Sequence, residues 1–433
     1  MTTETAREKT IEVLVYIVQV VGIGTNISLL RIMWAMMTGS FLKSRGSVHG
    51  ALEECGFEDE EIRRGWSGLR YGSWKIEDMI EAWQAKVASD GEWEANKIEK
   101  YRVKSIDITG FWRPKLKGSV NKLYNSTAQR ALPAVIFGVM TCSGKIGEKR
   151  VSLLQQIVRC EIGTSEKEFH TELLKATKKS MLADEMVVVD AGFTVAEMIE
   201  NEIERFVVRG AINCTARKNV LPEYKGRGVY PKYGELIRPL PRSYKGKETA
   251  ATEAEKAGNF LYDERTIRHE SWHNLVTSTT EVNEENTTFS IYVYHDPAYK
   301  KPLVLITVMD LKAESLYLAY KDRWPVEHPP LASKQMIGLH RQFVSHTESC
   351  FRLPELGLLT GNILSHLAAS LPPIPTGFWD RTPKSTPGRL RRLLSRAIFP
   401  NLDPFGPELR KKNSISDHLP KGIDAHRCSK AAT

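Results

Sequence analysis

The sequence is poor in cysteine and has no close cysteine pair. Its six cysteines are scattered over 433 residues, with no Cys-x2-Cys pair and no histidine pair nearby at zinc-finger spacing. A disulfide-stabilised scaffold and a zinc finger are therefore excluded. A reducing compartment such as the cytosol fits this pattern best.

Long hydrophobic runs are missing as well. The longest apolar stretch, residues 13–23, is interrupted by Gln19 and falls short of the ~20 residues that a membrane span needs. Glu4 and Glu8 precede it, where a secretory signal would have a basic start. We expect a buried helix here, no membrane association and a cytoplasmic protein.

What is present is the composition of a folded protein. Hydrophobic residues make up 41% and charged residues 26%, which excludes a wholly disordered chain. The length predicts two or three folded units. The net charge of +9 is concentrated at one end: residues 377–433 hold 12 Lys/Arg and 5 Asp/Glu, or +7, which leaves +2 for the rest. Such a tail can bind nucleic acid by neutralising phosphates, or it can be a solvated end.

Residues 1–95 have the pattern of helices. Apolar runs at 11–21 and 27–37 are followed by a charged segment at 57–66. This pattern fits a helix-turn-helix reader of DNA ends, and it fits equally well a plain helical bundle with Trp66, Trp74 and Trp83 in its core.

Strand patterns begin near residue 101. Residues 101–109 alternate and are rich in β-branched side chains, 132–140 form an apolar run, and 186–190 resemble a buried strand between helical segments at 165–179 and 194–206. This order predicts an α/β core. We therefore expect a helical region at 1–95, a core at 96–213 and 308–372, a β-rich insertion at 214–307, and a disordered basic, Pro-rich tail at 373–433.

One segment of the second core region combines an acid, two bases and a phenol. Tyr320, Arg323, Glu327 and Lys334 stand at offsets 0, 3, 7 and 14, which return to nearly one face of a helix. The carboxylate suits a metal ion, and the Tyr, Arg and Lys donors suit DNA phosphates on either side of it. An exposed polar helix face is the alternative interpretation.

These residues resemble the C-terminal signature Tyr-x2-Arg-x3-Glu-x6-Lys of the DDE transposases of the insertion-sequence-four, or YREK, group. That group also has an Asp-x-Gly-Phe signature around its second catalytic Asp, and this chain has Asp190-Ala-Gly-Phe193 after an apolar run. The weaker first signature is matched by Asp107-Ile-Thr109. The resemblance covers residues 100–345 and implies an RNase H-like mixed sheet with flanking helices, split by the β insertion.

The resemblance implies Asp107, Asp190 and Glu327 as catalytic metal ligands, with Asp107 and Asp190 on neighbouring strands. Converging carboxylates need a cation between them, and an all-oxygen set selects Mg2+, with Mn2+ as a substitute and two ions expected. The implied activity is cleavage of insertion-sequence ends and joining of the freed 3'-hydroxyls to target DNA. The expected partners are terminal inverted repeats, target DNA and a second copy in a synaptic complex, in the prokaryotic cytosol on the nucleoid.

Prolines depart from a regular helix in the signature. Pro329 and Pro330 follow Glu327 closely, and an interior proline removes a hydrogen bond and clashes with the carbonyl four residues back. We expect the helix to break there, which would place Lys334 on a separate helical segment.

Further interpretations remain open. His269-Glu270-Ser-Trp-His273 matches a zinc metallopeptidase motif, which requires a helix, although its surroundings are β-branched. Trp272 is a candidate DNA-binding residue that would stack on an unpaired base, or else a packed side chain of the β insertion. A catalytically inactive, transposase-derived DNA-binding protein is the third possibility.

Overall fold

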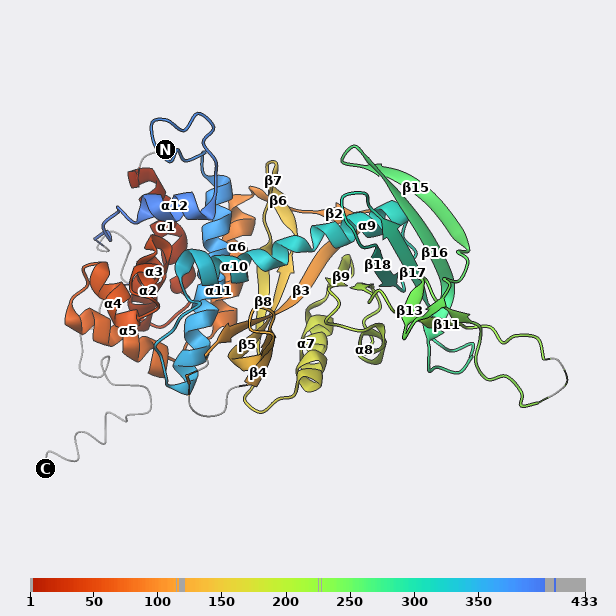
Figure 1. Cartoon of the computed structure of the whole chain (residues 1–433). Helices are drawn as coiled ribbons and strands as arrows, with labels where there is room; N and C mark the ends of the chain where they lie inside the picture. The colour runs from red at the N-terminus through yellow and green to blue at the C-terminus, as the bar shows by residue number, and fades with distance from the viewer. Residues whose placement is uncertain are drawn as a thin grey trace, which may run out of the picture. The chain divides into compact units, whose positions relative to one another are not determined.

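The computed structural model describes residues 3–113, 115–116, 121–224, 226, 228–401 and 409 (Figure 1). The chain divides into two compact units. The first contains Met1–Ala95, Ile108–Thr164 and Pro325–Thr433, and the second contains Asn96–Asp107 and Ser165–Trp324. The units are therefore interleaved in sequence rather than arranged end to end.

The first unit contains α-helices from the N-terminal and C-terminal segments of the chain, and the predicted N-terminal helices are confirmed. They are α1 (Thr3–Val18), α2 (Thr25–Thr38), α3 (Ser40–Lys43), α4 (Val48–Glu54), α5 (Asp59–Tyr71), α6 (Ile76–Asp90), α10 (His328–Leu331), α11 (Thr347–Ser370) and α12 (Pro387–Leu394). A capping box between Glu58 and Glu61 begins α5, and Gly91 ends α6 with a left-handed φ of 68°. Among the described residues, no helix is long and apolar enough to cross a membrane.

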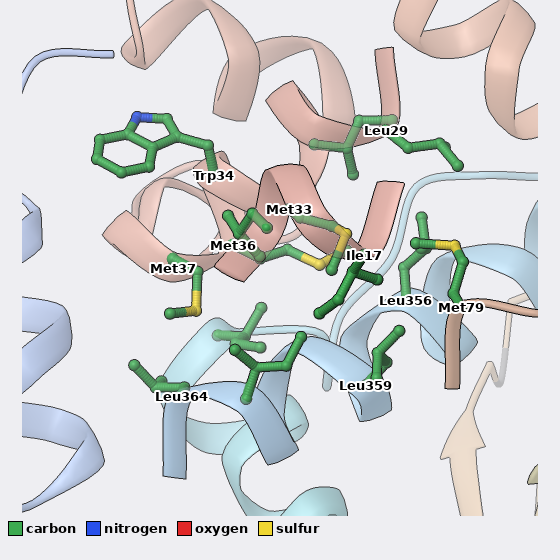
Figure 2. Packing of buried hydrophobic residues seen from close by; sticks show 14 of the residues in the cluster. Ile17, Leu29, Met33, Trp34, Met36, Met37, Met79, Leu356, Leu359 and Leu364 are labelled. Carbon is green, nitrogen blue, oxygen red and sulfur yellow. The ribbon is translucent and has the colours of Figure 1, made fainter. Parts of the chain in front are cut away.

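The core of this unit forms around α2, which is buried from Asn26 to Thr38. A helix that is apolar on all sides requires neighbours on all sides. Figure 2 shows the methionines of α2 near Ile17 of α1 and the leucines of α11, all within one buried cluster. Trp74 and Trp83 are buried in the same cluster and Trp66 packs against it, as the helical-bundle interpretation requires.

The first unit also holds strands and a part of β3 (Tyr101–Trp112). Strand β5 (Arg130–Cys142) pairs antiparallel with β4 (Asn121–Asn125) and β8 (Leu153–Arg159). A separate small sheet contains β1 (Trp93–Ala95), β6 (Gly144–Ile146) and β7 (Lys149–Arg150).

The second unit contains most of a large mixed sheet, as predicted for an α/β protein. Its strands are ordered β12-β11-β16-β17-β18-β10-β9-β3, with β15 on β16 and β2 on β3. Strands β3, β9 and β10 run parallel, and β18 is antiparallel to β10. The core strands are β2 (Lys97–Ile98), β9 (Glu185–Val189) and β10 (Phe206–Arg209), and the helices are α7 (Glu166–Ser180), α8 (Val195–Glu200) and α9 (Ala313–Asp322).

The interval expected to be β-rich, 214–307, contains strands and no helix among its described residues. They are β11 (Ala216–Lys218), β12 (Leu236–Ile237), β13 (Arg242–Tyr244), β14 (Lys247–Thr249), β15 (Lys256–Tyr262), β16 (Arg265–Thr277), β17 (Phe289–His295) and β18 (Leu303–Thr307). Strands β17 and β18 continue the sheet from β10, so this segment extends the core sheet.

The expected helix break after Glu327 is wrong. The backbone stays helical from α9 through η1 (Trp324–Glu327, 3-10) and α10 to η2 (Ala332–Ile337, π). The prolines change the type of helix instead. Pro329 and Pro330 fall within the short α10, where the missing N–H groups of a first turn cost nothing.

The expected disordered tail is also partly wrong. Residues 373–401 are described, and they include α12, whose Leu390 and Leu394 are fully buried. Thr386 caps this helix by accepting a hydrogen bond from the Arg389 amide. Apart from Leu409, the later part of the predicted tail lies outside the described residues.

Candidate functional site

Asp107 lies within β3, and Asp190 directly follows β9, at neighbouring positions of two parallel strands in the second unit. Ile106 of β3 and Val189 of β9 are register partners, and Asp107 and Asp190 are the next residues along each strand. Side chains next to each other in a parallel sheet point to the same face. The two carboxylates are half-buried, so the fold places two acids at neighbouring positions on one face of the sheet.

A buried ion pair supports this register. Lys104 of β3 lies 2.9 Å from the carboxylate of Glu185 at the start of β9, and both side chains are almost fully enclosed. The Lys104 ammonium also donates to the Ser180 carbonyl at 3.0 Å. Because a one-residue slip of either strand would break a buried charge pair, these contacts hold Asp107 beside Asp190.

The Asp190 carboxylate is surrounded by donors. Its Oδ1 accepts hydrogen bonds from the Ala191 amide at 2.8 Å, from Arg209 at 3.2 Å and from the Tyr320 hydroxyl at 3.2 Å. Arg323 lies 3.7 Å from Oδ2. Burial acts to raise the pKa of Asp190, but the Ala191 hydrogen bond and the two arginines prevail and lower it.

Contacts with α7 and α8 stabilise the turn that carries Asp190. The Phe193 amide donates to the Asp190 carbonyl at 3.2 Å, and the Phe193 ring stacks on His170 of α7 at 4.6 Å. His170 in turn lies 3.0 Å from Glu197, which forms a capping box with Thr194 at the start of α8. Figure 1 shows α7 and α8 together beside β9. The Asp-x-Gly-Phe signature is thus a turn fixed between a strand and two helices.

Tyr320 and Arg323 approach Asp190 from α9, which packs on β9 and β10. Arg323 is only 6% exposed, and its guanidinium lies 5.6 Å from the centroid of the Tyr320 ring. Two of the four signature residues are therefore gathered at the second aspartate.

Arg209 is a site residue that the sequence reasoning missed. It ends β10, which lies next to β9 in parallel, and this brings its guanidinium to Asp190. The signal was a basic residue directly after the apolar run 206–208, just as Asp190 directly follows the apolar run 186–189.

Glu327 and Lys334 belong to the first unit. Glu327 is the last residue of η1 and is half-buried. The Lys334 ammonium, on η2, donates to the Thr109 hydroxyl at 2.7 Å and lies 5.2 Å and 5.0 Å from the ring centroids of Phe111 and Trp112. Lys334 is thus fixed on β3 two residues beyond Asp107.

Two interpretations of the sequence change with the structure. Trp272 is 1% exposed, and its indole donates to the Glu253 carbonyl at 2.9 Å, which is the packed alternative and leaves no face for a base. The metallopeptidase interpretation is wrong, because His269 and His273 lie on strand β16 rather than on a helix. His273 instead lies 3.0 Å from the hydroxyls of both Ser271 and Ser290.

The donor chemistry of the aspartate pair suits a hard divalent cation, because both acids supply only oxygen atoms. Within the part of the chain that the structure describes, no three His, Cys, Asp or Glu side chains are grouped as ligands of one ion. Among the described residues, the structure therefore brings the two aspartates to neighbouring strands but does not group Glu327 with them as ligands of one ion.

No protein-family model and no curated protein sequence matches this chain. Among solved structures, it is similar to the NurA nuclease from Sulfolobus solfataricus, with 10% sequence identity and a TM-score of 0.23. The match covers 57% of this chain and 83% of the nuclease chain. At this score, the similarity is too weak to transfer an activity.

Proposed function

We propose that this chain is a metal-dependent DNA transposase of the DDE type, with Asp107, Asp190 and Glu327 as its catalytic carboxylates. The observation that carries the proposal is the aspartate pair on β3 and β9, next to Tyr320 and Arg323 of the YREK-like signature. Two motifs far apart in sequence thereby meet at one carboxylate.

Glu327 is proposed as the third ligand. Tyr320 contacts Asp190 directly, and helical backbone continues without interruption from Tyr320 to Glu327. Bound Mg2+ or Mn2+ at these oxygens would supply activation of the attacking oxygen and stabilisation of the leaving one.

In this proposal, the basic residues bind the DNA backbone. Arg209 and Arg323 provide planar guanidinium groups that suit phosphate oxygens, and Tyr320 provides a hydroxyl donor. Lys334 adds an ammonium on the β3 side. Together, these four side chains would hold the scissile phosphate against the carboxylates. The phosphate would be attacked first by water and then by the freed 3'-hydroxyl. Synapsis of two ends would require a second copy of the chain.

The test is cleavage of labelled element-end DNA in Mg2+. We expect Asp190→Asn and Glu327→Gln each to lower cleavage by at least about a thousandfold, while end binding changes less than about threefold, since the charge at the reacting phosphate is lost but the cationic contacts stay. Glu314→Gln, an exposed acid at the start of α9, is the matched control and should cut normally. Persisting cleavage in Glu327→Gln would remove Glu327 from the site.

One observation favours a second candidate, an inactive DNA-binding protein. Asp190 is fully engaged by Arg209, Arg323 and Tyr320, so its charge is balanced without a metal. In that case, Mn2+ would not bind in calorimetry and neither variant would differ from the native chain in any DNA assay.

A further inference from the structure

Two aromatic side chains project from a loop between α11 and α12. Phe378 is 100% exposed and Trp379 is 66% exposed, and their rings lie 5.0 Å apart at 80°. Large apolar side chains are costly to leave in water, so two adjacent ones at a loop tip indicate a binding surface. We refer to these two residues as the aromatic tip.

The loop that carries the aromatic tip is braced at its base. The Ile374 amide donates to the Lys384 carbonyl at 3.2 Å, which closes the loop. Asp380 accepts hydrogen bonds from the Thr376 amide at 3.0 Å and from Arg389 of α12 at 2.7 Å. Because α12 is anchored by its own buried leucines, the loop presents the tip on a fixed support.

The position of the Trp379 ring is also constrained. A Cβ added at Gly377 would lie 2.5 Å from this ring, so the ring lies directly over the glycine backbone. Any larger residue at this position would push the ring away. The indole therefore lies against the backbone of Gly377 while two thirds of its surface stays open.

The charge around the tip selects its partner. Between residues 356 and 402 the only acid is Asp380, against six basic residues: Arg381, Lys384, Arg389, Arg391, Arg392 and Arg396. Arg389 neutralises Asp380, and Arg381, Lys384, Arg392 and Arg396 are exposed. An exposed aromatic pair followed closely in sequence by exposed cations matches the stacked bases and phosphates of DNA.

A second copy of the chain fits less well. Two aromatic side chains bury about 150–250 Å² each, well below the roughly 800 Å² per partner of a stable interface. Stacking on a base does not need such an area, because one aromatic face covers one base.

We propose that Phe378 and Trp379 stack on an unpaired or terminal DNA base while Arg381 and Lys384 bind the adjacent phosphates. This deepens the proposed function, since it adds a contact to the same DNA, but it involves neither metal nor cleavage.

The test measures binding of the full chain, without metal, to a short duplex carrying a single-stranded extension and to the same duplex with blunt ends. We expect the double variant Phe378→Ala/Trp379→Ala to bind the extended duplex on the order of tenfold more weakly and to lose the preference over the blunt one. Phe343→Ala removes an equally exposed ring from the same unit and should bind normally. Arg381→Gln/Lys384→Gln should lower the slope of log affinity against log salt by about 2.

Three outcomes would overturn the inference. One is unchanged DNA binding in the double variant. The others are an altered oligomeric state in sedimentation with DNA binding intact, which indicates a second copy, and loss of binding to phosphatidylserine vesicles with DNA binding intact, which indicates a membrane surface. If the double variant loses its preference for the extended duplex but the native chain does not cleave DNA in Mg2+, the aromatic tip is supported and the transposase proposal is rejected.

Discussion

At the scale of single residues, Asp190 is the most informative position. Its carboxylate is paired with Arg209 and Arg323 and accepts a hydrogen bond from Tyr320. A divalent cation would have to share this carboxylate with the same positive groups. Under the proposed function, the arginines would compete with metal in the free protein and would become available to phosphates once metal is bound.

Replacing Arg209 should reveal this competition. We expect Arg209→Gln to tighten Mn2+ binding about two- to fivefold in calorimetry, because a half-exposed ion pair contributes at most about 1 kcal/mol. The same variant should weaken DNA binding and lower its salt slope by about 1. Lys179→Gln, an exposed cation of α7, is the control. Weaker Mn2+ binding in Arg209→Gln would contradict the competition.

His366 gives a prediction about pH. It is 4% exposed on α11, against Trp83 at 4.9 Å, and its Nδ1 has no hydrogen-bond partner among the described residues. Burial lowers its pKa to about 4, with Asp90 acting to raise the pKa and Lys9 to lower it. Because the folded pKa lies below the unfolded value of about 6.5, its contribution to stability is present above pH 6.5 and is lost as pH falls toward 4.

We therefore expect the native chain to lose about 2 kcal/mol of unfolding free energy between pH 7.5 and pH 5 through this residue. His366→Phe keeps an aromatic ring against Trp83 but has no group that titrates. Its loss of unfolding free energy over the same pH range should therefore be about 2 kcal/mol smaller. Urea unfolding of both proteins at the two pH values measures the difference. Parallel pH profiles would show that folding does not lower the pKa of His366.

At the scale of elements, the strand patterns were the most predictable. The alternation at 101–109 and the apolar run at 186–190 correspond to β3 and β9, because a strand buried on both faces is read directly from its side chains. Helix type could not be predicted in the same way. Prolines near Glu327 exclude a regular α-helix, but whether the chain breaks or changes to 3-10 and π geometry depends on what packs against it.

That packing is provided by glycines of α11. A Cβ at Gly361 would lie 3.0 Å from the Pro329 carbonyl and the Ser333 amide, and one at Gly357 would lie 2.1 Å from a methyl of Leu339. Helix α11 therefore approaches the backbone of α10 and η2 closely. This contact supports the segment that follows Glu327 and carries Lys334.

Gly361→Ala should consequently destabilise the chain, although alanine favours helices by up to ~1 kcal/mol over glycine. We expect a net loss of about 1–3 kcal/mol in urea unfolding from overpacking. Cleavage should fall more than DNA binding does. Gly22→Ala, with no atom within 4 Å of the added Cβ, should be close to neutral. A stabilised Gly361→Ala variant would show that α11 can move away from α10 and η2 without loss of stability.

At the scale of the whole molecule, the sequence could not reveal the interleaving. Composition divides a chain into consecutive segments, whereas hydrogen bonding joins residues 96–107 to the segment that begins at residue 165. The basic end was misjudged for a related reason. Pro and Arg content favoured disorder, but two leucines one helical turn apart were enough to anchor α12 on the core.

Interleaving predicts how fragments behave. Residues 165–324 expressed alone would lack β3 and expose the apolar edge of β9, so we expect an aggregated product. Linking residues 96–107 to the start of this fragment should restore a soluble monomer in size-exclusion chromatography. Equal solubility of the two fragments would mean that β9 tolerates an open edge.

Strand β3 carries Asp107 and, two residues on, Thr109, which accepts the hydrogen bond from Lys334. Residues two apart in a strand share a face, so inserting or deleting one residue before Asp107 would invert both at once. Length variation should therefore be tolerated in the hairpin connections of 214–307 and rejected in β3. In a library of single-codon deletions, survivors with DNA-cutting activity should be absent from 101–109.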